Sequence, residues 1–232
     1  VGAATAATNV TYLGMDIFTT GATQIAGNRV ADIGPAASTI SSGVLAILIG
    51  TAANRLDVVD NEIRRASILP DTLDQPGWLA LVVLGRTVSV RGNLLESFGQ
   101  GAQTNPVLAA LPTDASTAYI LGADSCQFSD NQCFQDDLVL SEGHLALAVE
   151  VSVENQGLPI IAMGNYVQGP TGRVRVGDRL LTNPSLALTA AQPTQNNSGP
   201  VVTVLGNITS NGIDVNGVAL AAPWSPLNVT LG

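Results

Sequence analysis

The sequence predicts an all-β fold, with antiparallel sheets arranged as a sandwich or a barrel. Three observations favour it. Aromatic residues make up only 4% of the chain, and a core of small aliphatic side chains suits thin sheet layers. Apolar and polar residues alternate with a period of two in the second half, as at 145–153. Two Asn-Gly pairs, Asn211-Gly212 and Asn216-Gly217, are typical of type I′ hairpin turns.

Glycines and prolines divide the first half into separate segments. We expect a strand at 12–19 and an irregular stretch at 21–42, which is rich in Gly, Ala, Ser and Thr. The runs 43–50 and 78–84 are uniformly apolar, as in strands buried on both faces. The alternating segment 87–91 indicates a half-exposed strand.

One short helix is expected near 52–67. Leu56, Val59 and Ile63 share a helical face at this spacing. Asp60 precedes Arg64 by four residues, which is the favourable order for a helical ion pair.

The second half predicts a run of strands and hairpins. The alternating segments are 145–153, 158–163, 173–176 and 201–205. The two Asn-Gly pairs predict a tight meander over 201–221. The tail contains two prolines, so we expect an extended arm instead of a central strand.

A faint internal repeat relates 78–97 to 158–183. Both segments contain an apolar strand, a Gly-Arg or Gly-Asn pair, an alternating basic strand, and Gly-Asn or Gly-Asp before Leu-Leu. The pattern indicates either a β-hairpin unit used twice or a coincidence between two β-rich segments. We expect one domain over 1–232 with extended terminal arms; the alternative is two β subdomains, 1–116 and 117–232.

The charge of the chain is unusual. It contains nine arginines, no lysine and 18 acidic residues, giving a net charge of −9 with only 12% charged residues. Nucleic acid is disfavoured as a partner because phosphates require clustered cations. No apolar run approaches the roughly 20 residues of a membrane span. A surface so poor in charge predicts that sugars or neighbouring subunits cover it.

Cys126 and Cys133 bracket a short polar segment. Their spacing suits a local disulfide in an oxidising compartment, and the alternative is two free thiols. Four N-x-[ST] sequons, at Asn9, Asn196, Asn207 and Asn228, are possible glycosylation sites.

Catalytic motifs are missing from the sequence. His144 is the only histidine, and no G-x-S-x-G motif is present. Glu150 and Glu154 share a strand face, but at about 13 Å apart they do not fit the spacing of a glycosidase pair. We expect no catalytic residue, no cofactor and no metal.

Two weaker ligand readings remain open. Acidic residues near the cysteines could bind calcium; they are Asp124, Asp130, Asp136 and Asp137. Trp78 and Trp224 could form a carbohydrate platform, although burial as core or interface anchors suits them better. With Pro223 and Pro226, they are our candidate interface residues.

Residues 201–222, with their Gly-Asn-Ile-Thr and Asn-Gly-Val units, resemble segments of bacteriophage tail-fibre and spike proteins. Residues 158–181 resemble hairpins near the ends of some fibre proteins. The resemblance covers about a fifth of the chain, and it implies a non-enzymatic assembly role without assigning any functional residue.

The sequence therefore favours a self-assembling structural protein, either an extracellular filament or sheath subunit, or a fibre, capsid or decoration protein of a virion. Its expected partners are copies of itself, since interface cores are depleted in charge and especially in lysine. Two alternatives are a secreted glycan-binding module and a secreted hydrolase that uses carboxylates.

Overall fold

The computed structural model describes residues 11–31, 43–51, 55–64, 77–97, 116–135, 148–153, 159–168, 173–178, 201–209, 212–215, 218–219 and 229–230. These residues form strands and turns and contain no helix. The all-β character expected from the sequence is therefore confirmed for the described part of the chain, whereas the arrangement of its sheets is not the expected one.

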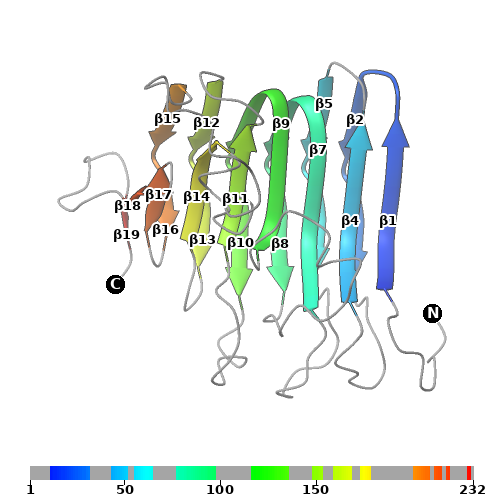
Figure 1. The fold of residues 1–232 in the computed structure, drawn as a ribbon. Coiled ribbons are helices and arrows are strands. Elements are labelled where there is room, and N and C mark those ends of the chain that lie inside the picture. The colour runs from blue at the N-terminus through cyan, green and yellow to red at the C-terminus, as the bar shows by residue number, and fades with distance from the viewer. Residues whose placement is uncertain are drawn as a thin grey trace.

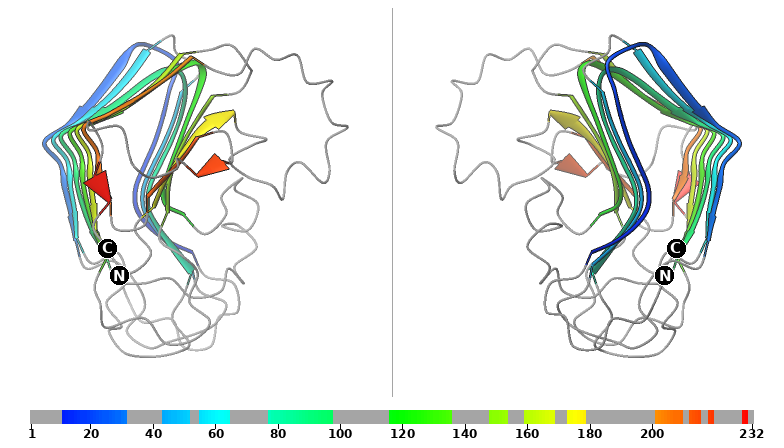
Figure 2. Two further views of the ribbon diagram at one scale, coloured as in Figure 1. Left: turned by 90° about the vertical axis from the view of Figure 1, so that its left-hand side faces the viewer. Right: turned by 90° about the vertical axis from the view of Figure 1, so that its right-hand side faces the viewer.

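The chain winds as a solenoid, and each winding, here called a coil, places strands on three faces (Figures 1 and 2). Face 1 contains β1 (Thr11–Thr19), β4 (Gly43–Thr51), β7 (Gly77–Arg91), β9 (Ser116–Ser129), β11 (Ala148–Val153), β14 (Arg173–Asp178) and β17 (Ile213–Val215). Face 2 contains β2 (Thr23–Ala26), β5 (Arg55–Val59), the later parts of β7 and β9, β12 (Pro159–Met163) and β15 (Val201–Leu205).

Face 3 is a separate seven-stranded sheet. In chain order its strands are β3 (Arg29–Ala31), β6 (Glu62–Arg64), β8 (Leu94–Ser97), β10 (Gln132–Gln135), β13 (Tyr166–Gln168), β16 (Ile208–Thr209) and β19 (Val229–Thr230). Each strand pairs in parallel with the strand of the next coil, as in Glu62↔Leu94 and Tyr166↔Ile208. Both sheets contain strands from both halves of the chain.

Parallel pairing contradicts the predicted antiparallel sandwich or barrel. Period-two alternation occurs in both kinds of strand, so it could not distinguish them. The predicted meander over 201–221 is also wrong, because β15 and β16 pair in parallel with β12 and β13. Only β17 and β18 (Val218–Ala219) are antiparallel among the described strands. The predicted Asn216-Gly217 turn separates them in sequence but lies outside the described residues.

The predicted helix at 52–67 is wrong as well. Its described part forms β5, a turn and β6. Leu56 and Ile63 point into the core from two different faces of the solenoid. Arg64 pairs with Glu62 and Glu96 instead of Asp60, which lies in the turn with a φ of +54°. The helical spacing of apolar residues arose because a turn separates two alternating strands.

Faces 1 and 2 join without a break in the two long strands β7 and β9. The pairing register shifts between Gly85 and Thr87, where β9 carries one extra residue. At this bend a side chain on Gly122 would lie 2.0 Å from the carbonyl oxygen of Ser125, so only glycine fits. Arg86 and Asp124 form an exposed ion pair across the bend, at 2.7 Å.

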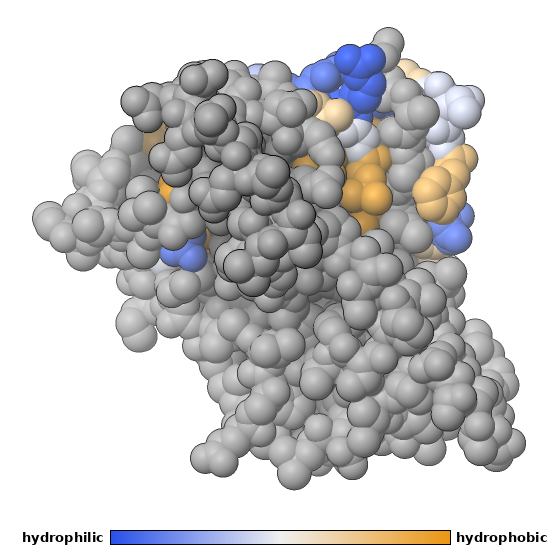
Figure 3. Space-filling view, viewed as in Figure 1, coloured by the Kyte–Doolittle hydropathy of each residue, from blue (hydrophilic) through white to orange (hydrophobic). Residues whose placement is uncertain are grey.

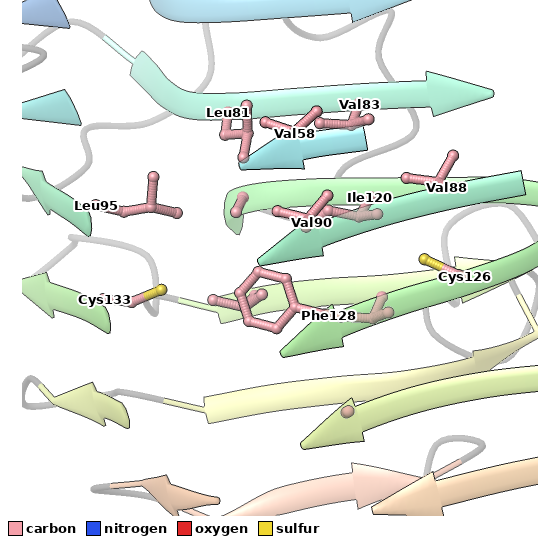
Figure 4. Packing of buried hydrophobic residues seen from close by; sticks show 14 of the residues in the cluster. Val58, Leu81, Val83, Val88, Val90, Leu95, Ile120, Cys126, Phe128 and Cys133 are labelled. Carbon is pink, nitrogen blue, oxygen red and sulfur yellow. The ribbon is translucent and has the colours of Figure 1, made fainter. Parts of the chain in front are cut away.

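Inward-facing residues of successive coils stack into one core. Val90, Phe128 and Ala162 are aligned across three coils by the strand register, and all three are fully buried. Figure 4 shows Phe128 in the middle of this packing. The small Ala162 beside Phe128 provides the space that the ring requires.

The predicted repeat of a β-hairpin unit is wrong, because the unit that recurs in the structure is a coil of parallel strands. Structurally equivalent positions are Gly92-Asn93 and Gly164-Asn165, because both pairs form the turn between faces 2 and 3. The repeat predicted from the sequence aligns Gly164-Asn165 with Gly85-Arg86, but Gly85-Arg86 lies at the bend between faces 1 and 2.

Candidate functional site

The turn between faces 2 and 3 repeats one short motif. It consists of a buried residue, any residue, Gly or Asp, Asn, any residue, and a second buried residue. The Gly or Asp always has positive φ, at positions 27, 60, 92, 130, 164 and 206. Glycine adopts this conformation freely, and Asp is among the few other residues that tolerate it. The next residue is always asparagine, so each coil turns its chain in the same way.

These asparagines form a hydrogen-bonded ladder through the solenoid; its members are Asn28, Asn61, Asn93, Asn131, Asn165 and Asn207. In the first five of these asparagines, the backbone N–H and the Nδ2 both donate to Oδ1 of the asparagine in the next coil. For Asn131 and Asn165 both distances are 3.1 Å. Asn131 Nδ2 also donates to the carbonyl oxygen of Val90, 3.0 Å away.

The ladder satisfies polar groups that are shut off from water. Asn131 and Asn207 are fully buried, and Asn61, Asn93 and Asn165 nearly so. Buried amides require hydrogen-bond partners, since an unpaired one costs about 1–3 kcal/mol. The ladder is therefore a structural device that specifies where each coil turns and which coils are neighbours.

Asn207, one of the four predicted glycosylation sites, belongs to this ladder. Its Nδ2, the atom to which a glycan would be attached, donates to the carbonyl oxygen of Ala162 at 2.9 Å. Glycosylation of Asn207 is therefore incompatible with its place in the fold. Asn9, Asn196 and Asn228 lie outside the described residues.

The predicted disulfide is wrong. Cys126 and Cys133 are free and buried. Cys126 points inward from β9 and Cys133 from β10, on two faces that meet at the Asn131 turn. Figure 4 shows Phe128 between them. A spacing of seven positions suggested a hairpin that would bring the sulfurs together, whereas the coil places them on separate inward-facing rows.

We expect both thiols to be inert in the folded protein and to destabilise it in alkali. Burial raises the pKa of Cys133 to about 12 and that of Cys126 further above its ordinary value. Thiols of the unfolded chain ionise near pH 8.5. Between about pH 8.5 and pH 12 the unfolded state thus binds fewer protons, and the free energy of unfolding falls as pH rises. Urea denaturation at pH 7 and pH 10 measures this fall in the free energy of unfolding.

A thiol reagent supplies the complementary measurement. At pH 8 the native protein should react slowly, and two equivalents should react at once in denaturant. The Cys126→Val, Cys133→Val double variant should lose part of the alkaline destabilisation. Rapid labelling of the native protein would contradict the burial of these groups.

The outer surface of face 3 divides into a charged part and an aromatic part. In the first three coils, Glu62 pairs with Arg29, at 3.4 Å, and with Arg64, and Arg64 also pairs with Glu96 at 2.8 Å. In the next two coils, the rings of Phe134 and Tyr166 lie 5.5 Å apart. The paired charges balance, so this face exerts little net attraction on ionic ligands.

Face 2 carries a shallow hollow of about 340 Å³ on its outer side. Three hydroxyl groups and one amide line it, from Thr87, Ser89, Ser125 and Gln127, with Pro159 and Ile161 as an apolar wall. Arg55 at its rim is held by Asp57 at 2.8 Å, and this hydrogen bond raises the pKa of the guanidinium.

No metal-binding cluster is found in the described part of the chain. It contains no group of three or more His, Cys, Asp or Glu side chains that could hold a metal ion. Asp124 pairs with Arg86, and Asp130 lies in a turn against Gly164, so the two are not gathered into a calcium site. Asp136, Asp137, His144 and Glu154 lie outside the described residues. Glu150 lies on β11, where its backbone is in register with that of Arg175 on β14.

The other candidate residues are only partly placed. Trp78 lies on β7, where it pairs with Val44 of β4. Pro223, Trp224 and Pro226 lie outside the described residues. The tryptophan platform and the proline-bearing arm therefore stay predictions.

No protein-family model matches the chain, and no curated protein or solved structure matches it significantly. The described residues include no helix that is long and apolar enough to cross a membrane.

Sequence reasoning missed the ladder, although a signal was present. The Gly-Asn or Asp-Asn pairs recur at intervals of 33, 32, 38, 34 and 42 residues. A search for this pair between two alternating segments finds the six turns that precede β3, β6, β8, β10, β13 and β16. The intervals vary because segments of different length connect the coils, so no fixed period stands out.

Proposed function

We propose that this protein is a non-enzymatic structural subunit that associates with copies of itself, in an extracellular filament or sheath or in a virion. The observation that carries the proposal is the open-ended architecture. A solenoid of parallel coils has no intrinsic limit to its length, and its end strands retain unpaired backbone groups. The low content of charged residues, 12% of the chain, supports the same proposal, because interface cores are depleted in charged residues.

The nature of the described surface helps to define how copies would meet. Phe18, at 70% exposure, is the only large hydrophobic residue among those described that is strongly exposed. On the face shown in Figure 3, hydrophobic and hydrophilic residues of the described part lie side by side. Association through the backbone edges of the sheets therefore has more support than association through a hydrophobic side.

The experiment is a measurement of size. Sedimentation velocity from 1 to 50 µM should reveal species much larger than a 23.7 kDa monomer, and negative-stain electron microscopy should show filaments or regular particles. Solutions should also contain more of the large species at higher protein concentration, by mass action. A protein that stays monomeric at all these concentrations would contradict the proposal.

A further inference from the structure

In the described part of the chain, the sheet of face 3 ends in two edge strands, β3 at the N-terminal end and β19 at the C-terminal end. Among the described strands, β3 pairs only with β6, and β19 pairs only with β16. All seven strands run parallel, so β19 of one copy could pair with β3 of another as each coil pairs with the next. Faces 1 and 2 are less simple at the C-terminal end, since β18 adds to β17 in the antiparallel direction.

The hydrogen bonds of the asparagine ladder also run in one direction, from each coil to the next. Oδ1 of each later member accepts hydrogen bonds from the asparagine of the preceding coil, as Asn61 accepts from Asn28 at 3.0 and 2.9 Å. Asn28 is the first member, and its Oδ1 accepts no hydrogen bond from the described residues. It is also only half-buried, whereas the later members are buried. The N-terminal end of the ladder thus presents an unused acceptor.

The core is also less well closed at this end. The inward-facing Ile25 and Val30 of the first coil are each 8% exposed, against 0% and 1% for their neighbours Val58 and Ile63 in the second coil. The edge strands β1, β2 and β3 contain no proline or lysine, which natural proteins use to protect edges. Solenoids that stay single need a polar terminal cap, and the described residues of the first coil lack one.

We propose that copies of this chain stack end to end, with the β19 end of one copy on the β3 end of the next, so that face 3 and the asparagine ladder continue between them. This inference rests on the proposed self-assembly and specifies its interface. A two-fold contact between two N-terminal ends would place the acceptor Oδ1 of one Asn28 against the same acceptor of the other copy. A head-to-tail contact would instead bring hydrogen-bond donors to the Asn28 Oδ1. In sequence, Asn228 stands before Val229 as Asn207 stands before Ile208, and these strands are in register.

The stacking defines its own register and repeat. Val229 would lie beside Arg29 of the second copy, and Thr230 beside Val30. Within one chain, Ile208 lies beside Val229 and Thr209 beside Thr230 in the same register. Arg29 is already paired with Glu62, so the contact brings no like charges together on this face. With seven strands in the sheet and a strand spacing of about 4.8 Å, the axial rise per subunit would be about 34 Å.

Two proline variants test the two ends separately. In the second to the sixth coil, the residue after the ladder asparagine donates its N–H to the preceding coil, as Glu62 does to Asn28 at 2.8 Å. The N–H of Arg29 therefore faces the open edge, and by the alternation of a parallel strand so does that of Thr230. Arg29→Pro and Thr230→Pro each remove one outward donor and place a ring on one edge. Arg29→Ala and Thr230→Ala are the matched controls.

We expect the wild-type protein and both alanine variants to form filaments with a rise near 34 Å, and each proline variant alone to remain monomeric. Mixed in equal amounts, the two proline variants should form a heterodimer and nothing larger, because one intact head meets one intact tail. Circular dichroism and a melting temperature within a few degrees of wild type verify that the variants are folded.

The outcomes separate the two proposals. If the wild type is monomeric, both self-assembly and stacking are wrong. If it assembles but the proline variants assemble equally well, self-assembly stands and end-to-end stacking is wrong. If Thr230→Pro alone forms a symmetric dimer, the contact is between two N-terminal ends and the head-to-tail inference is overturned.

Discussion

Replacing Asn131 by alanine is expected to lower the free energy of unfolding by about 3–6 kcal/mol. Asn131 is fully buried in the middle of the ladder. Its side chain accepts from the backbone N–H of Asn93 at 3.0 Å and donates to the carbonyl oxygen of Val90 at 3.0 Å. Alanine would leave both backbone groups buried without these partners, and water cannot reach them.

Asn28→Ala is the matched control within the same motif. Asn28 lies at the open end, and its Nδ2 donates to the partly exposed Ala26 carbonyl and to Asn61. We expect a cost of about 1 kcal/mol or less, since water can replace these bonds. Urea denaturation of the two variants beside the wild type measures the difference. Equal losses for Asn28→Ala and Asn131→Ala would show that the ladder does not stabilise the coils.

Replacing Phe128 by alanine should cost about 3–5 kcal/mol. Among the described residues, Phe128 has the largest of the fully buried side chains. It stacks between Val90 of the preceding coil and Ala162 of the following coil. Neither neighbour is large enough to fill the space that the ring would vacate, so the cavity would persist, and the melting temperature should fall accordingly.

Phe134→Ala is the control for this prediction. Phe134 lies only six residues further along the chain but on the outer side of face 3, where it is half-buried against the ring of Tyr166. Loss of that contact should cost about 1 kcal/mol. If Phe134→Ala destabilised the protein as much as Phe128→Ala, the assignment of inward and outward sides on these strands would be wrong.

The sequence was informative about local structure. The runs at 43–50 and 78–84 are strands, as their apolar composition predicts, and 87–91 continues the second of these strands. Residues 159–163, 173–176 and 201–205 are in strands for the same reason. Where a turn interrupted the alternation, as between Leu56 and Ile63, the pattern acquired a helical spacing and misled the prediction.

The candidate site residues were predicted less well, because their roles depend on contacts across coils. Asn207 reads as a glycosylation sequon in sequence, but its amide bonds to Asn165 and Ala162, 42 and 45 residues away. Cys126 and Cys133 are close in sequence, and yet their strands belong to two different faces. No local rule reports on such neighbours.

The sequence by itself determined that the described chain is made of strands, where many of them lie, and that its surface carries few charges. Only the tertiary structure decided that these strands are parallel and wound into coils. The physical reason is that alternation specifies which side of a strand is buried, whereas direction and partner depend on contacts more than 30 residues apart. Here those contacts are the asparagine ladder and the stacked inward rows of the core.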